Sequence, residues 1–448
     1  MDIQNFHSLL EAINSSAVKE AEAEFNNLIQ NDPALLLQLL VNSIQTFQDK
    51  TVNFAITLLG RTATLIGPNL INIGNDEFHN SFQSSLLSLI QSHINDFNLV
   101  PSLSNAISTF AAIYQLQQRW PTFCVSLLQF IYQPDQGLVA PSPNSPLSSF
   151  IATEIIYHCI NNDIIELNQE IIQYIITVIQ AVFQNVSTVE SHQLVSTVKL
   201  ALYSYLKVQI DELSALSMPI VKIIPTLPPN SIDDYLRAIS LFSDLNTTFF
   251  APAIGDLMNT LLQILNESQD INLSRNISCI NILTQVICND KYFETIEPKS
   301  FDFYQMFLMI LSRSPFNLDP EEGLDRSNIM MVTEDAIESL SNYFAEANTD
   351  LHSNVWDLFN ECLSNNDINH VIANLIGFSK AVSGCASIFS TAIINEAGDD
   401  VDLKSNPDFL NVYKTTILNE DPKMRCIGIE SLTTVMRSFG EYLRNFGG

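Results

Sequence analysis

The sequence has few glycines and few basic residues, and each shortage excludes a class of protein. It holds 13 glycines among 448 residues, and it shows no clear alternation of apolar and polar residues, which argues against a sheet-rich fold. Lys and Arg number 20 against 49 Asp and Glu, so the formal net charge is −29. Such a field repels nucleic acid and anionic membranes and attracts basic partners. Solubility alone is the other interpretation of this acidity.

Signatures of catalysis, metal binding and membrane insertion are also missing from the sequence. No P-loop, dinucleotide fingerprint or Gly-x-Ser-x-Gly motif occurs, so we expect no enzymatic activity and no cofactor. The seven cysteines include no Cys-x-x-Cys pair and the seven histidines are scattered, so we expect no metal site, and free thiols in a reducing compartment. The most hydrophobic stretch, residues 171–183, is interrupted by Gln173, Thr177 and Gln180, so we expect no membrane insertion.

Apolar residues recur at helical spacing along most of the chain. In residues 17–29 they form one stripe with charged residues between them, and residues 52–63 and 424–435 repeat the pattern. Prolines, which are tolerated in the first turn of a helix, break the stripes at short intervals. These breaks fall at Asp32-Pro33, Gly67-Pro68, Val100-Pro101, Trp120-Pro121, Pro228-Pro229 and Asp421-Pro422. Helices of roughly 13–20 residues, paired with a period of about 40–45 residues, match HEAT or armadillo arrays.

We therefore predict an all-α fold, a right-handed superhelical solenoid of about ten HEAT-type antiparallel helix pairs. The chain is longer than one compact core normally organises, and one helix pair cannot bury its apolar stripe alone, so neighbouring pairs must stack. Such a stack offers extended surfaces that bind other macromolecules, whereas catalytic pockets are not its natural product.

Two segments lack the helical spacing of apolar residues, and each is expected to lie between the two helices of one repeat. Residues 133–146 contain four prolines and predict an extended loop. Residues 319–325 form a short acidic loop, whose acids Asp319, Glu321, Glu322 and Asp325 are candidates for clamping lysines of a basic partner. An ordinary exposed loop is the alternative.

Six segments, in this order along the chain, carry a resemblance to a known family. They are Leu9-Leu10-Glu11-Ala12 followed by Val18-Lys19-Glu20-Ala21-Glu22, residues 52–61, Trp120-Pro121 followed by Leu127-Leu128, residues 272–286 with Arg275, residues 363–385, and Asp421-Pro422-Lys423-Met424-Arg425. Their order and spacing resemble the importin-beta (karyopherin-beta) superfamily of nuclear transport receptors, and are most similar to the branch that carries ribosomal proteins and histones. Full receptors of this family are longer, so the resemblance covers their N-terminal half, and the chain would be either a short form or one truncated relative to the family.

The resemblance implies a division of the chain and a set of partners. Residues 1–116 would be the Ran-binding repeats, residues 117–318 the central repeats, residues 319–325 the acidic loop and residues 326–448 the C-terminal repeats. Partners would be Ran-GTP, basic protein cargo such as ribosomal proteins or histones, and phenylalanine-glycine nucleoporins, which would bind the first helices of the pairs. The receptor would work as a monomer that moves between cytoplasm and nucleus through the nuclear pore, without direct nucleic-acid contact.

The resemblance places candidate Ran contacts on the second helix of the second repeat. They are Asn53, Thr57 and Arg61, for which plain surface polarity is the alternative explanation. Trp120 is expected to pack in the core, and Asp421 and Arg425 to satisfy helix ends, as in the Asp–Arg ladders between HEAT repeats.

Two further functions stay open at this point. One is a HEAT-repeat scaffold for another complex. The other is a chaperone that shields basic proteins without dependence on Ran.

Overall fold

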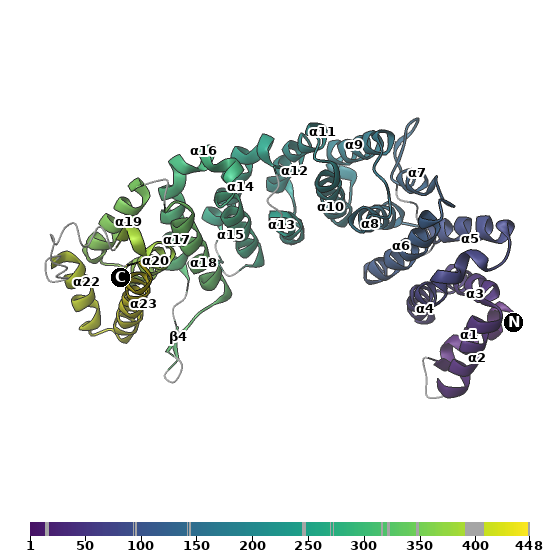
Figure 1. The fold of residues 1–448 in the computed structure, drawn as a ribbon, viewed down its shortest axis with the longest axis horizontal. Helices are drawn as coiled ribbons and strands as arrows, with labels where there is room; N and C mark the ends of the chain where they lie inside the picture. Colours follow the sequence, from purple (N-terminus) through teal and green to yellow (C-terminus); the bar gives the residue numbers. More distant parts are fainter. Residues whose placement is uncertain are drawn as a thin grey trace. The chain divides into compact units, whose positions relative to one another are not determined.

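The computed structural model describes most of the chain in two units. It describes residues 1–13, 18–92, 94, 96–140, 142, 145–243, 248–268, 270–271, 273–314, 317–319, 323–345, 349–389 and 407–446. Residues 1–231 form unit 1 and residues 232–448 form unit 2. Each unit is a stack of antiparallel helix pairs (Figure 1), so the prediction of an all-α HEAT-type fold is confirmed. The predicted domain boundaries at residues 116 and 318 stay predictions.

Unit 1 stacks its helix pairs in two layers. The first helices are α1 (Ile3–Ile13), α3 (Pro33–Thr46), α5 (Asp76–Ser88), α7 (Phe123–Leu128) and α9 (Gln169–Gln184), and their partners are α2 (Val18–Asn31), α4 (Thr51–Ile66), α6 (Val100–Leu116), α8 (Ser148–Asn161) and α10 (Ser191–Val208). The short helices α11 (Asp211–Ser214) and α12 (Ser217–Ile223) follow. The second helices α4, α6, α8 and α10 pack one against the next, and we call them the second-helix layer of unit 1.

Unit 2 repeats this arrangement. It begins within α13 (Pro229–Ser243) and continues with α14 (Ile254–Glu267), α15 (Ser274–Ile287), α16 (Phe293–Ile296), α17 (Ser300–Arg313), α18 (Asn328–Tyr343), α19 (Thr349–Glu361), α20 (Ile368–Gly384), α22 (Pro407–Ile417) and α23 (Pro422–Phe446). Helices α15, α18, α20 and α23 pack in sequence and form the second-helix layer of unit 2. The described parts of both units together contain about ten pairs, as predicted.

Proline and its neighbours start the helices where the sequence predicts. At α3 the backbone N–H of Leu35 donates to Oδ1 of Asp32, with Pro33 in the first turn. At α23 the N–H of Lys423 donates to Asp421 at 2.7 Å, so Asp421 caps this helix. Arg425 donates to the carbonyl oxygens of residues 419 and 420, in the turn before its own helix. The expected ladder between repeats is therefore wrong for Arg425, which closes a local turn.

The apolar stripes become the core between the layers. In α9 the polar interruptions Gln173, Thr177 and Gln180 are all exposed, whereas the isoleucines between them are buried, as an amphipathic helix requires. Trp120 is buried against Tyr114 and Phe123, which confirms its place in the core. No helix in the described ranges is long and apolar enough to cross a membrane.

The cysteines are packed as free thiols. Cys124, Cys159, Cys279, Cys362 and Cys385 are buried, and Cys288 and Cys426 are half-buried. Burial raises the pKa of the Cys124 thiol to about 12, which keeps it protonated and unreactive at neutral pH.

The two predicted loops lie between the helices of one repeat, but both contain paired strands. Strands β1 (Tyr132–Gln133) and β2 (Gly137–Leu138) form a hairpin between α7 and α8, with Gly137 at a positive φ of 80°. Strands β3 (Asn317–Asp319) and β4 (Gly323–Asp325) form a second hairpin between α17 and α18. The compositions of these segments do not reveal this backbone pairing.

Candidate functional site

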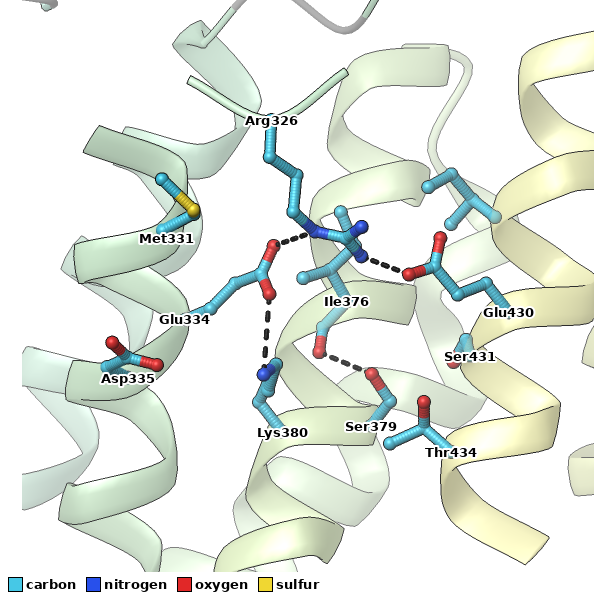
Figure 2. A pocket seen from close by; sticks show the side chains of 11 residues that line it. Arg326, Met331, Glu334, Asp335, Ile376, Ser379, Lys380, Glu430, Ser431 and Thr434 are labelled. Carbon is cyan, nitrogen blue, oxygen red and sulfur yellow. Dashed lines mark hydrogen bonds and ion pairs between the residues drawn. The ribbon is translucent and has the colours of Figure 1, made fainter. Parts of the chain in front are cut away.

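A group of charged side chains links three helices of the second-helix layer of unit 2. Glu334 of α18 accepts from Nε of Arg326 at 2.9 Å and lies 3.4 Å from Nζ of Lys380 on α20. Arg326 also pairs through Nη2 with Glu430 of α23, and Lys380 lies 3.6 Å from Glu338 of α18. Figure 2 shows Glu334, Lys380 and Glu430 converging from α18, α20 and α23, with Arg326 between the two glutamates. We call Arg326, Glu334, Glu338, Lys380 and Glu430 the ion network.

The helices position the ion network through spacing and close packing. Glu334 and Glu338 are one turn apart on α18, so both face Lys380. The end of α20 lies very close to α18, because a Cβ at Gly384 would collide with the carbonyl oxygen of Glu338. Only a residue without a side chain allows this approach, which brings Lys380 within reach of both carboxylates.

Glu334 is the buried centre of the ion network. Its side chain is only 5% exposed, and a buried carboxylate needs pairing with cations and hydrogen-bond donors. Burial acts to lower the pKa of Arg326, but Glu334 and Glu430 outweigh it and leave the pKa of this guanidinium above its ordinary value. Arg326 therefore stays charged and holds α18 and α23 together through carboxylates of both helices.

Four residues of the ion network, all except Glu338, line an open pocket of about 390 Å³. The lining is completed by Met331, Asp335, Ile376, Ser379, Ile427, Ser431 and Thr434. Its carboxylates are Glu334, Asp335 and Glu430 and its cations Arg326 and Lys380, so the lining carries one negative charge more than positive ones. Asp335 is exposed and makes no ion pair among the described residues. A Lys or Arg of a partner can bind Asp335 directly, or compete for Glu430.

The acidic segment predicted from the sequence leads directly into this pocket. Asp319 lies in β3 and Asp325 in β4, and Asp325 immediately precedes Arg326. Strand β4 packs against α23, so the root of the hairpin lies beside the ion network. Glu321 and Glu322 lie outside the described residues. The clamp proposed for these four acids stays a prediction.

The candidate Ran contacts lie on α4 in unit 1. Asn53, Thr57 and Arg61 are exposed and follow one another at intervals of one helical turn. Thr57 Oγ1 donates to the carbonyl oxygen of Asn53 at 2.9 Å. Within the described ranges no acidic side chain pairs with Arg61, so its charge is available to a partner. The structure thus gathers the three residues in one row, and their role stays a prediction.

Sequence reasoning missed the ion network, although one signal was available. Glu334 lies within the apolar stripe of α18, among the buried residues Ile329, Met330, Ala336 and Ile337. An acidic residue on an apolar face implies a buried ion pair. Its partners Arg326, Lys380 and Glu430 come from other segments, and no motif connects them along the chain.

In the described part of the chain no group of His, Cys, Asp or Glu is arranged to hold a metal ion. In the pocket Glu334 and Glu430 are paired with cations, Asp335 makes no ion pair among the described residues, and Ser379, Ser431 and Thr434 supply hydroxyls. The arrangement suits recognition of charged groups.

Comparison with known proteins identifies the fold. No family model matches the sequence, and no curated protein matches it. Solved structures of the karyopherin Kap121p do match: the structure of Kap121p itself has a TM-score of 0.73 at 14% identity, and covers 99% of this chain and 41% of that chain.

The chain has the fold of the karyopherin Kap121p. Kap121p bound to RanGTP matches with a TM-score of 0.72 at 15% identity, and Kap121p bound to Pho4p with 0.74 at 14%. Both cover 99% of this chain and 41% and 42%, respectively, of the Kap121p chain. The chain therefore spans about two fifths of the length of the structures it matches. The expected karyopherin fold is confirmed over nearly the whole sequence.

Proposed function

We propose that the chain is a nuclear transport receptor, or the N-terminal part of one, which binds Ran-GTP and protein cargo. The observation that carries this proposal is the match of 99% of the chain to Kap121p, which has been crystallised with RanGTP and with Pho4p. The proposed role is non-enzymatic: the protein would bind its cargo in one compartment and release it in the other, and would be present in both cytoplasm and nucleus.

The ion network pocket would bind a basic segment of the cargo. Its surplus of carboxylates, the exposed Asp335 and the adjacent root of the acidic hairpin support this assignment. Charge complementarity of this kind raises the association rate and selects against acidic partners. The net charge of −29 favours encounter with basic proteins such as ribosomal proteins or histones.

Ran-GTP would bind the row of Asn53, Thr57 and Arg61 on α4. Cargo and Ran-GTP would be coupled because each repeat contacts only its neighbours, so that small rotations add along a stack. Nucleoporins with phenylalanine-glycine repeats would bind between the first helices of the pairs. Kap121p has been crystallised with Nup53p, which supports a nucleoporin as a partner.

Binding of Ran in its two nucleotide states tests the proposal. Isothermal titration calorimetry should detect binding of Ran loaded with a non-hydrolysable GTP analogue and no binding of Ran-GDP. Arg61→Glu should weaken the binding of GTP-loaded Ran at least tenfold. Arg437→Glu is the matched control, because Arg437 is an exposed arginine of α23 in unit 2. Equal binding of both nucleotide states, or of neither, would contradict the proposal.

A chaperone of basic proteins is the second candidate, and the acidic pocket itself favours it. It predicts salt-sensitive binding of a histone that excess Ran-GTP does not displace. The transport proposal predicts displacement in the same titration.

A further inference from the structure

The second-helix layer of unit 1 has one edge at which successive helices begin. A pocket joins the start of α4, from Asp49 to Asn53, to the segment from Ile94 to Leu99 that precedes α6. Phe97 in this segment contacts Phe150 at the start of α8, with ring centroids 6.1 Å apart, and His192 at the start of α10, at 4.3 Å. The starts of α4, α6, α8 and α10 therefore form one continuous surface, which we call the rim.

The rim contains two hollows with an exposed aromatic side chain between them. The first hollow has about 480 Å³, and the apolar part of its lining is Ile44, Phe47, Val52, Ile94 and Leu99. The second has about 420 Å³, and the apolar part of its lining is Ile131, Leu138, Val139, Ala140, Pro146, Phe150, Val182 and Val189. Phe97 separates them and is 48% exposed. Concave apolar surface beside an exposed aromatic ring is typical of a binding site for apolar side chains.

Oriented carboxylates accompany the apolar surface. Asp96 accepts the backbone N–H of Asn98 at 2.9 Å, and Asp49 accepts that of Thr51 at 2.8 Å, so both carboxylates are held at the first hollow. Glu190 lines the second hollow, and its side chain does not cap α10. Nε2 of His7 lies 2.9 Å from Asp49. Among the residues that line the two hollows, the three acids face one lysine, Lys50.

At the second hollow, His192 does not offset the negative charge of Glu190. Burial lowers the pKa of His192, against the opposing effect of Glu190, so the ring is neutral at neutral pH. Between Arg61 and Lys199 the sequence has one basic side chain, Arg119, and it pairs with Asp76 at 3.2 Å. The rim therefore favours a basic occupant, and it disfavours a second copy of this strongly acidic chain.

We propose that the rim binds an extended segment of a partner protein in which aromatic or aliphatic residues alternate with Lys or Arg. Four neighbouring helices at about 8–10 Å separation span roughly 30 Å. An extended segment of about nine residues covers this distance at about 3.3 Å per residue. Alternate residues of such a segment point to opposite sides, so apolar residues reach the two hollows while basic residues near the edges meet the carboxylates.

The ion network pocket lies in unit 2 and shares no residue with the rim. The row of Asn53, Thr57 and Arg61 along α4 meets the rim at Asn53, which lines the first hollow. The occupant of the rim does not depend on the transport function: a scaffold or chaperone with this rim would bind the same class of segment.

Selection from a random twelve-residue phage-displayed library on the whole chain tests the proposal. We expect the selected peptides to contain at least one aromatic or large aliphatic residue next to Lys or Arg. The consensus peptide is then synthesised with a fluorescent label, and its affinity for the wild-type chain and for variants is measured by fluorescence anisotropy.

Two variants and a matched control locate the binding site. Phe97→Ser should weaken binding at least tenfold, and Glu190→Lys should weaken it about fivefold at low salt and less at high salt. Leu116→Ser should leave the affinity unchanged, because Leu116 is an 83% exposed apolar residue at the opposite end of α6. Circular dichroism melts check that the variants fold.

Three outcomes would overturn the proposal. The library yields no consensus, or a consensus without basic residues, or a consensus peptide whose affinity survives both Phe97→Ser and Glu190→Lys. The last outcome places the peptide elsewhere, and repeating the titration with Arg326→Gln shows whether it binds the ion network pocket.

Discussion

Both units bury a glutamate of the second-helix layer beside a lysine of the next helix, but in different surroundings. In unit 1 Glu154 of α8 lies 3.6 Å from Nζ of Lys199 on α10, and in unit 2 Glu334 of α18 lies 3.4 Å from Nζ of Lys380 on α20. The two glutamates are 8% and 5% exposed. The second-helix layers of the two units thus each contain a buried Glu–Lys bridge between neighbouring helices.

The groups around each bridge determine what it can do. Glu154 also accepts from the hydroxyl of Ser196, and Lys199 lies over the ring of Tyr157 at 5.5 Å. This bridge is enclosed by neutral groups and braces two helices. Glu334 instead shares its charge with Arg326, which continues to Glu430, and the bridge opens into a charged pocket. A structural bridge therefore becomes a recognition site when extra charges connect it to a third helix.

Removal of Glu334 tests the larger network first. Glu334→Ala leaves Arg326 and Lys380 without their shared carboxylate, and we expect unit 2 to lose about 3 kcal/mol, as when one partner of a buried ion pair is removed. The protein has two tryptophans, Trp120 in unit 1 and Trp356 in unit 2. Urea unfolding followed by fluorescence in a Trp120→Phe background therefore reports on unit 2 alone. A loss under about 1 kcal/mol would show that Glu334 is not the centre of the network.

Glu154→Ala is the equivalent change in unit 1 and should cost less, about 1–2 kcal/mol, because it unpairs one half-buried cation that keeps its contact with Tyr157. Fluorescence of Trp120 in a Trp356→Phe background measures it. An equal or larger loss than for Glu334→Ala would mean that the charges of Arg326 and Glu430 add nothing to the shared bridge.

Removal of Arg326 in unit 2 should change the affinity of the protein for a basic peptide, whereas removal of Lys199 in unit 1 should not. Arg326→Gln takes a positive charge from the pocket lining, so we expect an eight-residue oligolysine peptide to bind roughly threefold more tightly at low ionic strength, where charges within about one Debye length interact. Fluorescence anisotropy at two salt concentrations measures this. Lys199→Gln removes the equivalent charge of unit 1 and should leave the affinity unchanged. Weaker binding to Arg326→Gln would show that this residue shapes the pocket for its ligand.

Sequence patterns predicted the fold well because the physics behind them is local. Asp32-Pro33 and Asp421-Pro422 start helices through a side-chain cap and a proline in the first turn, and both signals lie within a few residues. Gln173, Thr177 and Gln180 are exposed because they share one face of a single helix. Such features need no knowledge of the rest of the chain.

The site was harder to predict because it depends on contacts between repeats. The acidic loop was visible as composition, but the pairing of β3 with β4 and the contact of Glu334 with Lys380 join residues that packing brings together. The rim could not be predicted for the same reason. Phe97 and His192 belong to no sequence motif, and they become neighbours only because α6, α8 and α10 pack side by side.

The fourth prediction has the smallest expected effect: acidification should destabilise unit 1 through His158. His158 lies one turn from Glu154 in α8, and burial lowers its pKa below 6.5, assisted by Lys199 and opposed by Glu154. The unfolded chain then binds more protons than the folded one around and below pH 6.5, so unit 1 loses stability as the pH falls through this range. The ion network of unit 2 contains no histidine.

We therefore expect His158→Gln to flatten the decline of unit 1 between pH 7 and pH 5, measured by urea unfolding with Trp120 fluorescence, and to leave unit 2 unchanged. His192 contributes a decline of the same sign in unit 1, because burial lowers its pKa too, so the flattening will be partial and the double variant His158→Gln/His192→Gln should complete it. If the stability of His158→Gln declines with pH as steeply as that of the wild type, His158 does not cause the decline of unit 1. The two bridges would then not differ in their response to acid through this histidine, and only Arg326 and Glu430 would distinguish their surroundings.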